Sequence, residues 1–368
     1  MSLRGTAAIV GIGELPTRRS YPGRSTEGVC AEAARIAIDD AGLRKEDIDG
    51  LIVEGGALTP AMMADYMGLR PVFATGVSMQ GATGTTAVTV AAAVINAGLC
   101  TTVLITMGNA PGGAGGRRRP GAAGGSIAAE FEAPFGPAQG AGTGYALIYR
   151  RHMYEYGTTP EQLAKVAADQ RFNALQNPNS AFMGQPITVE DVLNSRFINE
   201  PLHLLECVMP SAGAAACVVT RADRAKSQPN RPVYLLGAGL EQANAAIWQT
   251  PRITTTPVKV SAARAFNMAG YGPQDMQFAE FYDCYTILVA ATLEDAGFCK
   301  KGEIGPFYET TDTTYQGTFP INTDGGQLSC GQPGLAGGFR HVIEAARQIM
   351  GRAGPRQVPK NDLCMVNG

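Results

Sequence analysis

The 368-residue chain has no excess of charge of either sign, because 30 basic and 32 acidic residues leave a net charge of -2. That balance gives no electrostatic reason to bind nucleic acid, which requires a basic patch. The eight cysteines are dispersed along the chain and include no C-x-x-C pair. Such spacing argues against a zinc site or a disulfide framework and is typical of a reduced, cytosolic protein.

Charge is absent altogether from residues 71–116, and Ala87–Met107 within them is apolar over roughly the length of a membrane span. Asn96, Gly98 and Thr101 interrupt this stretch, and alanine-rich sequence gives way there to β-branched sequence. The pattern predicts a helix buried on all sides followed by a central strand, not a membrane span. The N-terminus also lacks the long apolar stretch of a signal peptide, so we expect a cytoplasmic protein.

What the chain does contain is an internal repeat. Two segments each read as a helix end, a turn and the entry to a strand: Ala41–Val53 and Ala269–Phe281. Two later segments, at similar spacing, each read as a helix followed by a strand: Val88–Ile105 and Val342–Val366. A fixed order of matching strand–helix units predicts a duplicated α/β half.

The repeat divides the chain into two halves and an insertion. We assign residues 1–108 and 206–222 to the N-terminal half, 109–205 to a loop and helical insertion, and 223–368 to the C-terminal half. The first half has a fifth strand at Ala214–Thr220, whereas the second stops straight after its fourth. The sequence therefore predicts that a final strand is absent from these residues. The fourth strand, around Leu363–Val366, should then have one unpaired side.

Motifs along nearly the whole chain resemble the thiolase superfamily. They follow the order of its sterol-carrier-protein thiolase and lipid-transfer-protein branch, and within it they resemble the thiolase-like steroid side-chain aldolases. The matching segments are Ile9–Gly13, Tyr156–Ala164, Arg171–Ala174, Asn177–Pro178, Pro201–Leu202, Ser211–Ala215, Glu280–Tyr285, Gly297–Cys299 and Pro320–Gly326. The resemblance implies an α/β fold, a thiolase-like αβαβα five-layer sandwich with the two duplicated helices in the middle layer.

The sequence departs from this family where a thiolase performs its chemistry. In a thiolase, a cysteine at the start of the first buried helix is the nucleophile, because the helix N-terminus lowers its pKa. Gly81 stands at that position here, and Gln332 stands in place of the histidine in the Gly-His-Pro pattern. An amide cannot act as a general base. The third pattern, His-Asp-Cys-Phe, reads Tyr282-Asp283-Cys284-Tyr285.

These replacements favour a reaction that needs no covalent intermediate. The resemblance implies an acyl-CoA pocket, and the steroid aldolases keep a tyrosine at the position of Tyr282. We therefore expect retro-aldol cleavage of a β-hydroxyacyl-CoA, with Tyr282 as acid/base and Asp283 orienting it. A free tyrosine has a pKa of about 10, so a base role requires strong depression of that pKa. Gln332 is either an oxyanion donor or a relic of a degenerate site.

Two alternatives remain open at this stage. One is an acyltransferase with an unusual nucleophile, for which Cys330 is the candidate, although buried packing is the commoner role of a free cysteine. The other is a catalytically silent subunit that binds acyl-CoA. Arg117, Arg118 and Arg119 lie in a glycine-rich loop, where they either grip CoA phosphates or are simply solvated. The histidines are weaker candidates, and His341 is expected in the core or at an interface.

The resemblance also implies partners. We expect no bound cofactor, with coenzyme A entering only as part of the substrate. The branch dimerises through the edge of one sheet, which implies a homodimer. Its members often work with a small zinc-finger/OB-fold acyl-CoA-binding protein, so a heteromer is a further expectation.

Overall fold

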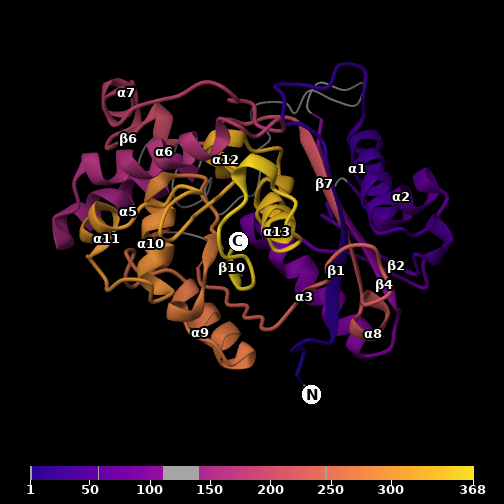
Figure 1. Cartoon of the computed structure of the whole chain (residues 1–368). Helices are drawn as coiled ribbons and strands as arrows, with labels where there is room; N and C mark the ends of the chain where they lie inside the picture. The colour runs from indigo at the N-terminus through magenta and orange to yellow at the C-terminus, as the bar shows by residue number, and fades with distance from the viewer. Residues whose placement is uncertain (1, 57, 111–140, 245–246) are drawn as a thin grey trace.

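The computed structural model describes residues 2–56, 58–110, 141–244 and 247–368 and arranges them in layers (Figure 1). Five strands of the first half, together with β8 from the start of the second half, form a six-stranded sheet in the order β3-β2-β4-β7-β1-β8. β2 is parallel to β3 and β4, whereas β7 is antiparallel to β4 and β1. The strands are β1 (Ala7–Glu14), β2 (Gly50–Val53), β3 (Phe73–Gly76), β4 (Thr102–Asn109), β7 (Gly213–Arg221) and β8 (Val233–Tyr234).

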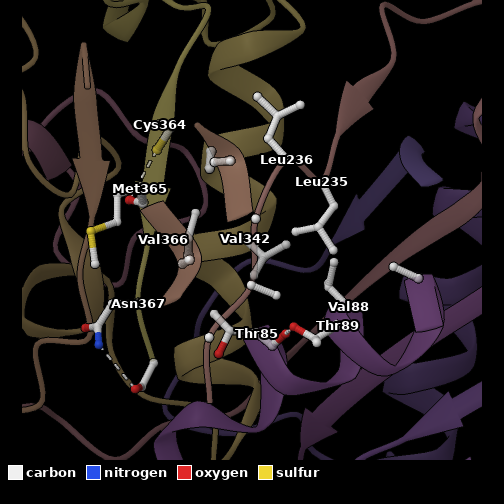
Figure 2. Close-up of a pocket in the computed structure, with 18 of the residues that line it drawn as sticks. Thr85, Val88, Thr89, Leu235, Leu236, Val342, Cys364, Met365, Val366 and Asn367 are labelled. Carbon is white, nitrogen blue, oxygen red and sulfur yellow. Dashed lines mark hydrogen bonds between the residues drawn. The ribbon is translucent and has the colours of Figure 1, made fainter. Parts of the chain in front are cut away.

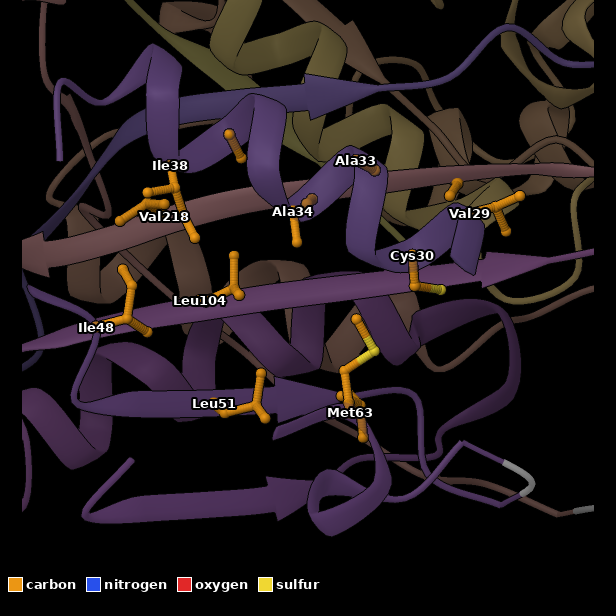
Figure 3. Packing of buried hydrophobic residues seen from close by; sticks show 14 of the residues in the cluster. Val29, Cys30, Ala33, Ala34, Ile38, Ile48, Leu51, Met63, Leu104 and Val218 are labelled. Atoms are coloured by element: carbon orange, nitrogen blue, oxygen red, sulfur yellow. The ribbon is translucent and has the colours of Figure 1, made fainter. Parts of the chain in front are cut away.

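Helices cover both faces of this sheet. α1 (Thr26–Asp40) and α2 (Pro60–Met67) pack on the outer face, where Figure 3 shows α1 presenting small and branched residues to Leu104 and Val218. Small residues allow α1 to lie close to β1, because a Cβ at Gly13 of β1 would collide with the carbonyl oxygen of Ala33 in α1. A fully buried leucine such as Leu104 contributes about 1.5–3 kcal/mol to the stability of this layer.

The second half repeats the pattern with shorter strands. α9 (Val258–Ala269) ends at Gly270 in the left-handed conformation, and a 3-10 turn leads into β9 (Phe278–Glu280), as α1 leads into β2. β9 is parallel to β10 (Cys364–Val366) and bridges to Ile321 on its other side. α10 (Thr286–Asp295) follows β9, and α13 (Ala336–Ile349) precedes β10.

The two central helices lie between the sheets. α3 (Thr83–Asn96) and α13 share one buried cluster with the first sheet, including Ile105 and Phe339, and Val366 of β10 packs against it. Figure 1 shows the resulting order of layers, with α1 and α2 at one side, α3 and α13 in the middle, and α9 and α10 beyond β10. The predicted αβαβα arrangement of two duplicated halves is confirmed.

Most of the remaining elements form a helical cap over the second half. They are α5 (Ala141–Tyr156), α6 (Pro160–Ala174), α7 (Val189–Asn194), β5 (Phe197–Asn199), β6 (Leu202–His203), α11 (Ile304–Thr310) and α12 (Gly326–Cys330). The short helix α8 (Ala222–Ala225) instead packs against β1 and β7 of the first sheet. Arg117, Arg118 and Arg119 lie outside the described residues. Among the helices in the described ranges, none combines the length and apolar character needed to cross a bilayer.

One prediction about the first central helix was wrong. α3 begins at Thr83, earlier than the alanine-rich run suggested, and it is not buried on all sides. Ala93 is exposed, as are Gly98 and Leu99 just beyond the helix. One face of α3 is apolar because it packs against the sheet and α13. The exposed face near the C-terminal end of the helix is uncharged because it has small residues, which tolerate contact with solvent.

The predicted open edge of the second sheet is confirmed within the described residues. β10 pairs with β9 on one side, and its other edge faces a pocket of about 270 Å³. Figure 2 shows β10 on one side of this pocket and Leu235 and Leu236 on the other, with Val88 of α3 beneath. In the first half, β7 occupies the equivalent place between β4 and β1.

Candidate active site

Tyr282 lies in the turn between β9 and α10, at the carboxyl end of the strand. Its backbone N–H donates to Asn367 Oδ1 at 3.2 Å, and its hydroxyl accepts a hydrogen bond from Gln332 Nε2 at 3.2 Å. Both side chains are partly exposed, whereas the adjacent Asp283 and Gly331 are buried. The predicted residues Tyr282 and Gln332 therefore meet at a partly exposed position.

A segment just after the insertion links the two loops that carry this pair. The N–H of Val208 donates to the Cys284 carbonyl oxygen at 3.1 Å, and the N–H of Gln332 donates to Met209 O at 2.9 Å. Residues 207–211 thus run between the Tyr282 loop and the Gln332 loop. Because backbone bonds fix both loops, the tyrosine and the amide are held at a defined separation.

The aromatic ring of Tyr282 occupies the space where a side chain at position 81 would lie. A Cβ built on Gly81 would be 2.5 Å from Cζ of Tyr282. On the other side, a Cβ on Gly338, in the first turn of α13, would meet Gly81 O and lie 3.2 Å from Tyr282 Cδ2. The ring is therefore held between glycines at the starts of the two central helices. The lost nucleophile is replaced by an aromatic ring from another segment.

The position of the ring brings it to the N-terminal ends of two helices. Gly81 lies in the 3-10 turn (Gln80–Ala82) that leads into α3, and Gly338 lies near the start of α13. Helix N-termini carry a partial positive charge and favour nearby anions. The surroundings of Tyr282 are thus suited to a developing negative charge, such as that of a thioester enolate.

The electrostatic surroundings keep the phenol of Tyr282 protonated. Burial raises the pKa of Tyr282 above its ordinary value, and the Cys284 thiol and Asp283 carboxylate act in the same direction, while the hydrogen bond with Gln332 opposes them. The Cys284 thiol and burial also raise the pKa of Tyr145, whose ring lies 4.7 Å from that of Tyr285. A resting phenolate base is therefore disfavoured, and Tyr282 is set up as a hydrogen-bond donor or acid.

Asp283 does not contact the Tyr282 hydroxyl. Its Oδ1 accepts hydrogen bonds from the N–H of Gln327 at 2.9 Å and from Nε2 of His341 at 3.1 Å, and its Oδ2 accepts from the N–H of Leu328 at 3.2 Å. These bonds fix the start of α12 and His341. The predicted orientation of Tyr282 by Asp283 therefore does not run through a hydrogen bond to the phenol, and any such effect acts through the turn that both residues share.

The two cysteines considered as nucleophiles are in unfavourable surroundings. Cys330 ends α12, is buried, and its Sγ donates to Asp324 O at 3.0 Å while accepting from Asn177 Nδ2 at 3.4 Å. Burial raises the pKa of both the Cys330 and the Cys284 thiol above the ordinary range. A thiol held in this way is a poor nucleophile, since the thiolate is the reactive form.

Sequence reasoning missed Tyr145 and Gly338. Nothing in the sequence around Tyr145 marks it, because it reaches the site only through the packing of α5 against the turn before α10. Gly337 and Gly338 stand just before the helix that the sequence predicts from Val342, and two adjacent glycines are unfavourable in the first turn of a helix, so their place in α13 is explained by close packing. In the described part of the chain, no group of three His, Cys, Asp or Glu side chains could hold a metal ion.

Comparison with known proteins identifies the family. The family model of thiolase C-terminal domain-like proteins matches residues 239–368. A 17-hydroxy-3-oxo-4-pregnene-20-carboxyl-CoA lyase of Mycobacterium tuberculosis is 33% identical over 362 residues, which cover 95% of this chain and 92% of the relative. The solved structure of an Ltp2-ChsH2(DUF35) aldolase is 31% identical, covers 98% of this chain and 93% of that chain, and superposes with a TM-score of 0.88.

An acetyl-CoA acetyltransferase of Methanothermobacter thermautotrophicus is 40% identical, but the match covers only 61% of this chain and 58% of that relative. The five-layer fold and the glycine-framed tyrosine thus define a protein built like a thiolase but without the usual thiolase nucleophile. The chain belongs to the thiolase superfamily, in its sterol-carrier-protein thiolase branch.

Proposed function

We propose that this chain is an acyl-CoA lyase that cleaves a β-hydroxyacyl-CoA by a retro-aldol reaction. The observation that carries the proposal is the Tyr282 ring lying against Gly81, because the phenol-bearing end of that ring occupies the space where a thiolase has its cysteine side chain. The relative from Mycobacterium tuberculosis is named as a CoA lyase and the structural neighbour as an aldolase, which supports the same class of reaction. Coenzyme A enters as part of the substrate.

The proposed step needs one proton-transferring group. The β-hydroxyl proton passes to the phenol oxygen of Tyr282 as the Cα–Cβ bond breaks, so that the β-carbon becomes a ketone or aldehyde and the electron pair of the bond passes to the α-carbon of the thioester. In the same step Tyr282 gives its own phenolic proton to that α-carbon. The phenol is regenerated, so protons and electrons balance without a metal or a second base. The hydrogen bond from Gln332 Nε2 to the Tyr282 hydroxyl oxygen, at 3.2 Å, keeps that oxygen in place during the reaction.

The reaction is tested by supplying a β-hydroxyacyl-CoA in D2O and analysing products by mass spectrometry. We expect a carbonyl compound and a shortened acyl-CoA that carries one deuterium at the α-carbon, because the enolate is protonated from an exchangeable group. Hydrolysis of the thioester to free CoA, or no cleavage at all, would contradict the proposal. A panel of β-hydroxyacyl groups, from short chains to steroid side chains, would identify the substrate class.

The alternative is an acyltransferase, which the named activity of the Methanothermobacter relative supports. It requires an acyl-enzyme, and the raised thiol pKa of Cys330 and Cys284 argues against one. Incubation of the protein with acetoacetyl-CoA and free CoA distinguishes the two functions, since thiolysis consumes both to form acetyl-CoA, whereas retro-aldol cleavage uses no free CoA. A protein inactive in both assays that still binds acyl-CoA would be a silent subunit.

We also propose that the chain acts as a homodimer and with a small acyl-CoA-binding partner of the zinc-finger/OB-fold type. The edge strand β3 supports the dimer, because it ends the first sheet and the adjacent Val72 is 76% exposed. The structural neighbour is described as an Ltp2-ChsH2(DUF35) assembly, which supports a second subunit. Light scattering of the chain alone, and co-expression with a candidate partner, would test the two assemblies separately.

A further inference from the structure

A buried pair of side chains lies behind Tyr282 on the side away from its hydroxyl. Asp283 and His341 are fully withdrawn from solvent, and His341 Nε2 lies 3.1 Å from Asp283 Oδ1. The other ring nitrogen of His341 lies 3.7 Å from Oε2 of Glu280, at the end of β9. The imidazole therefore lies between two carboxylates that flank the Tyr282 turn on its interior side.

The pair connects three segments that build the site. Asp283 belongs to the Tyr282 turn, His341 belongs to α13, and the carboxylate of Asp283 accepts the first N–H groups of α12. α12 ends one residue before Gly331, and Gln332 follows directly. The bonds of Asp283 thus fix the Tyr282 turn relative to the helix that leads to Gln332.

Close packing leaves this arrangement little freedom. A Cβ on Gly337 would collide with Gln327 Oε1 and lie 2.8 Å from Gln332 Cγ, and Gln327 Nε2 lies 3.4 Å from His341 Nε2. The start of α13, the Gln327 side chain and Gln332 are therefore in contact with one another. A movement of His341 would be transmitted to both partners of the Tyr282–Gln332 hydrogen bond.

We propose that Asp283 and His341 are positioning residues, which hold Tyr282 and Gln332 at the separation that the reaction requires. This inference rests on the proposed lyase function, since it assigns the pair a part in the same site. The physical reason is that a buried carboxylate keeps a fixed place only when its oxygens are fully hydrogen-bonded or paired. The α12 amides bond both oxygens of Asp283, and His341 adds the one ring donor to Oδ1, so its loss leaves the buried carboxylate and the turn that carries Tyr282 held by two neutral amides alone.

The test compares His341→Leu with His341→Gln, because leucine removes both ring donors whereas glutamine keeps one amide donor for Asp283. We expect His341→Leu to lower kcat on the order of 10–100-fold with KM changed less than about twofold, as for a misplaced reacting group. We expect His341→Gln to recover a large part of that loss. The matched control is His152→Leu, since His152 is equally buried and bonded to Glu294 at 2.9 Å, but at the α5–α10 interface.

A readout independent of turnover separates this inference from the proposed function. Fluorotyrosine labelling gives a ¹⁹F resonance for Tyr282, assigned by its disappearance in Tyr282→Phe. We expect that resonance to shift in His341→Leu and to stay in place in His152→Leu. An unmoved resonance, unchanged kcat, or equal losses of kcat in both leucine variants would overturn the positioning role. If the wild type has no lyase activity but the Tyr282 resonance still shifts in His341→Leu, the proposed lyase function is wrong and the positioning of Tyr282 by His341 is retained.

Discussion

The ring of Tyr282 lies directly against Gly81, at a distance that leaves no room for a side chain on the glycine. The glycine at position 81 and the tyrosine at position 282 therefore depend on each other, although they lie far apart in the sequence. Replacement of the nucleophile by glycine opens a space, and replacement of a histidine by tyrosine at position 282 fills it. Each change alone would leave either a collision or a cavity, and both are unfavourable in a packed interior.

The contact predicts the outcome of restoring a side chain at position 81. Gly81→Ala forces Cβ against the Tyr282 ring, so we expect a loss of about 1–3 kcal/mol in the free energy of unfolding and a displaced phenol. Lyase turnover should fall accordingly, and Gly81→Cys should not produce thiolase activity. Denaturant unfolding and kinetics provide the measurements. Gly144→Ala in α5 is the control, since nothing lies within 4 Å of its Cβ position.

Removal of the phenol oxygen tests the acid/base assignment. Tyr282→Phe keeps the ring between Gly81 and Gly338, so we expect little change in stability but a loss of kcat of roughly 10²–10⁴-fold. The comparison is made at saturating β-hydroxyacyl-CoA, so that the effect on kcat is separated from binding. Unchanged turnover in the phenylalanine variant would remove Tyr282 from the mechanism and favour the silent-subunit alternative.

The buried thiols predict an absence of covalent chemistry. Burial raises the pKa of the Cys330 thiol, and that thiol donates a hydrogen bond to Asp324 O, so the reactive thiolate is disfavoured. Incubation with acyl-CoA should therefore leave the intact mass of the protein unchanged. Cys330→Ala should retain lyase activity within about twofold. An acyl adduct mapped to Cys330 or Cys284 would instead support the acyltransferase.

The ionisation of His341 predicts how stability varies with pH. Burial lowers the pKa of His341, but the hydrogen bonds and charges of Asp283 and Glu280 outweigh it and raise the pKa to about 10. A histidine with a raised folded-state pKa contributes stability that is fully present below its unfolded pKa of about 6.5 and is lost as pH rises toward 10. The unfolding free energy of the wild type should therefore decline over pH 6.5–10. His341→Leu should show a smaller decline, and parallel curves would refute the assignment.

The open edge of β10 predicts a local difference in amide exchange. The β10 amides bonded to β9 should exchange slowly, whereas those facing the pocket beside Leu235 and Leu236 should exchange fast, because they have no strand partner within the described residues. β7, paired on both sides, is the internal reference. Uniform protection of Cys364–Val366 and β7 would show that another segment covers the edge.

The sequence predicted the fold well because its signals were local and repeated. The order of helix end, turn and strand in Ala41–Val53 and Ala269–Phe281 recurs in the structure as α1 to β2 and α9 to β9. The strand count also anticipated the open edge of β10. Two features were not predicted correctly. The burial of α3 was overestimated, because an apolar composition does not reveal which face of a helix is exposed at its end. The pairing of β8, from the second half, with β1 of the first sheet was not foreseen.

The sequence by itself determined which functional groups are present, namely a tyrosine and an amide where a thiolase has histidines, and a glycine in place of the nucleophile. The tertiary structure decided what those groups can do. It packed the ring between Gly81 and Gly338, directed Asp283 toward α12 and His341 instead of toward the phenol, and raised the pKa of Tyr282. These features depend on contacts among segments far apart in the chain, so local sequence patterns do not contain them.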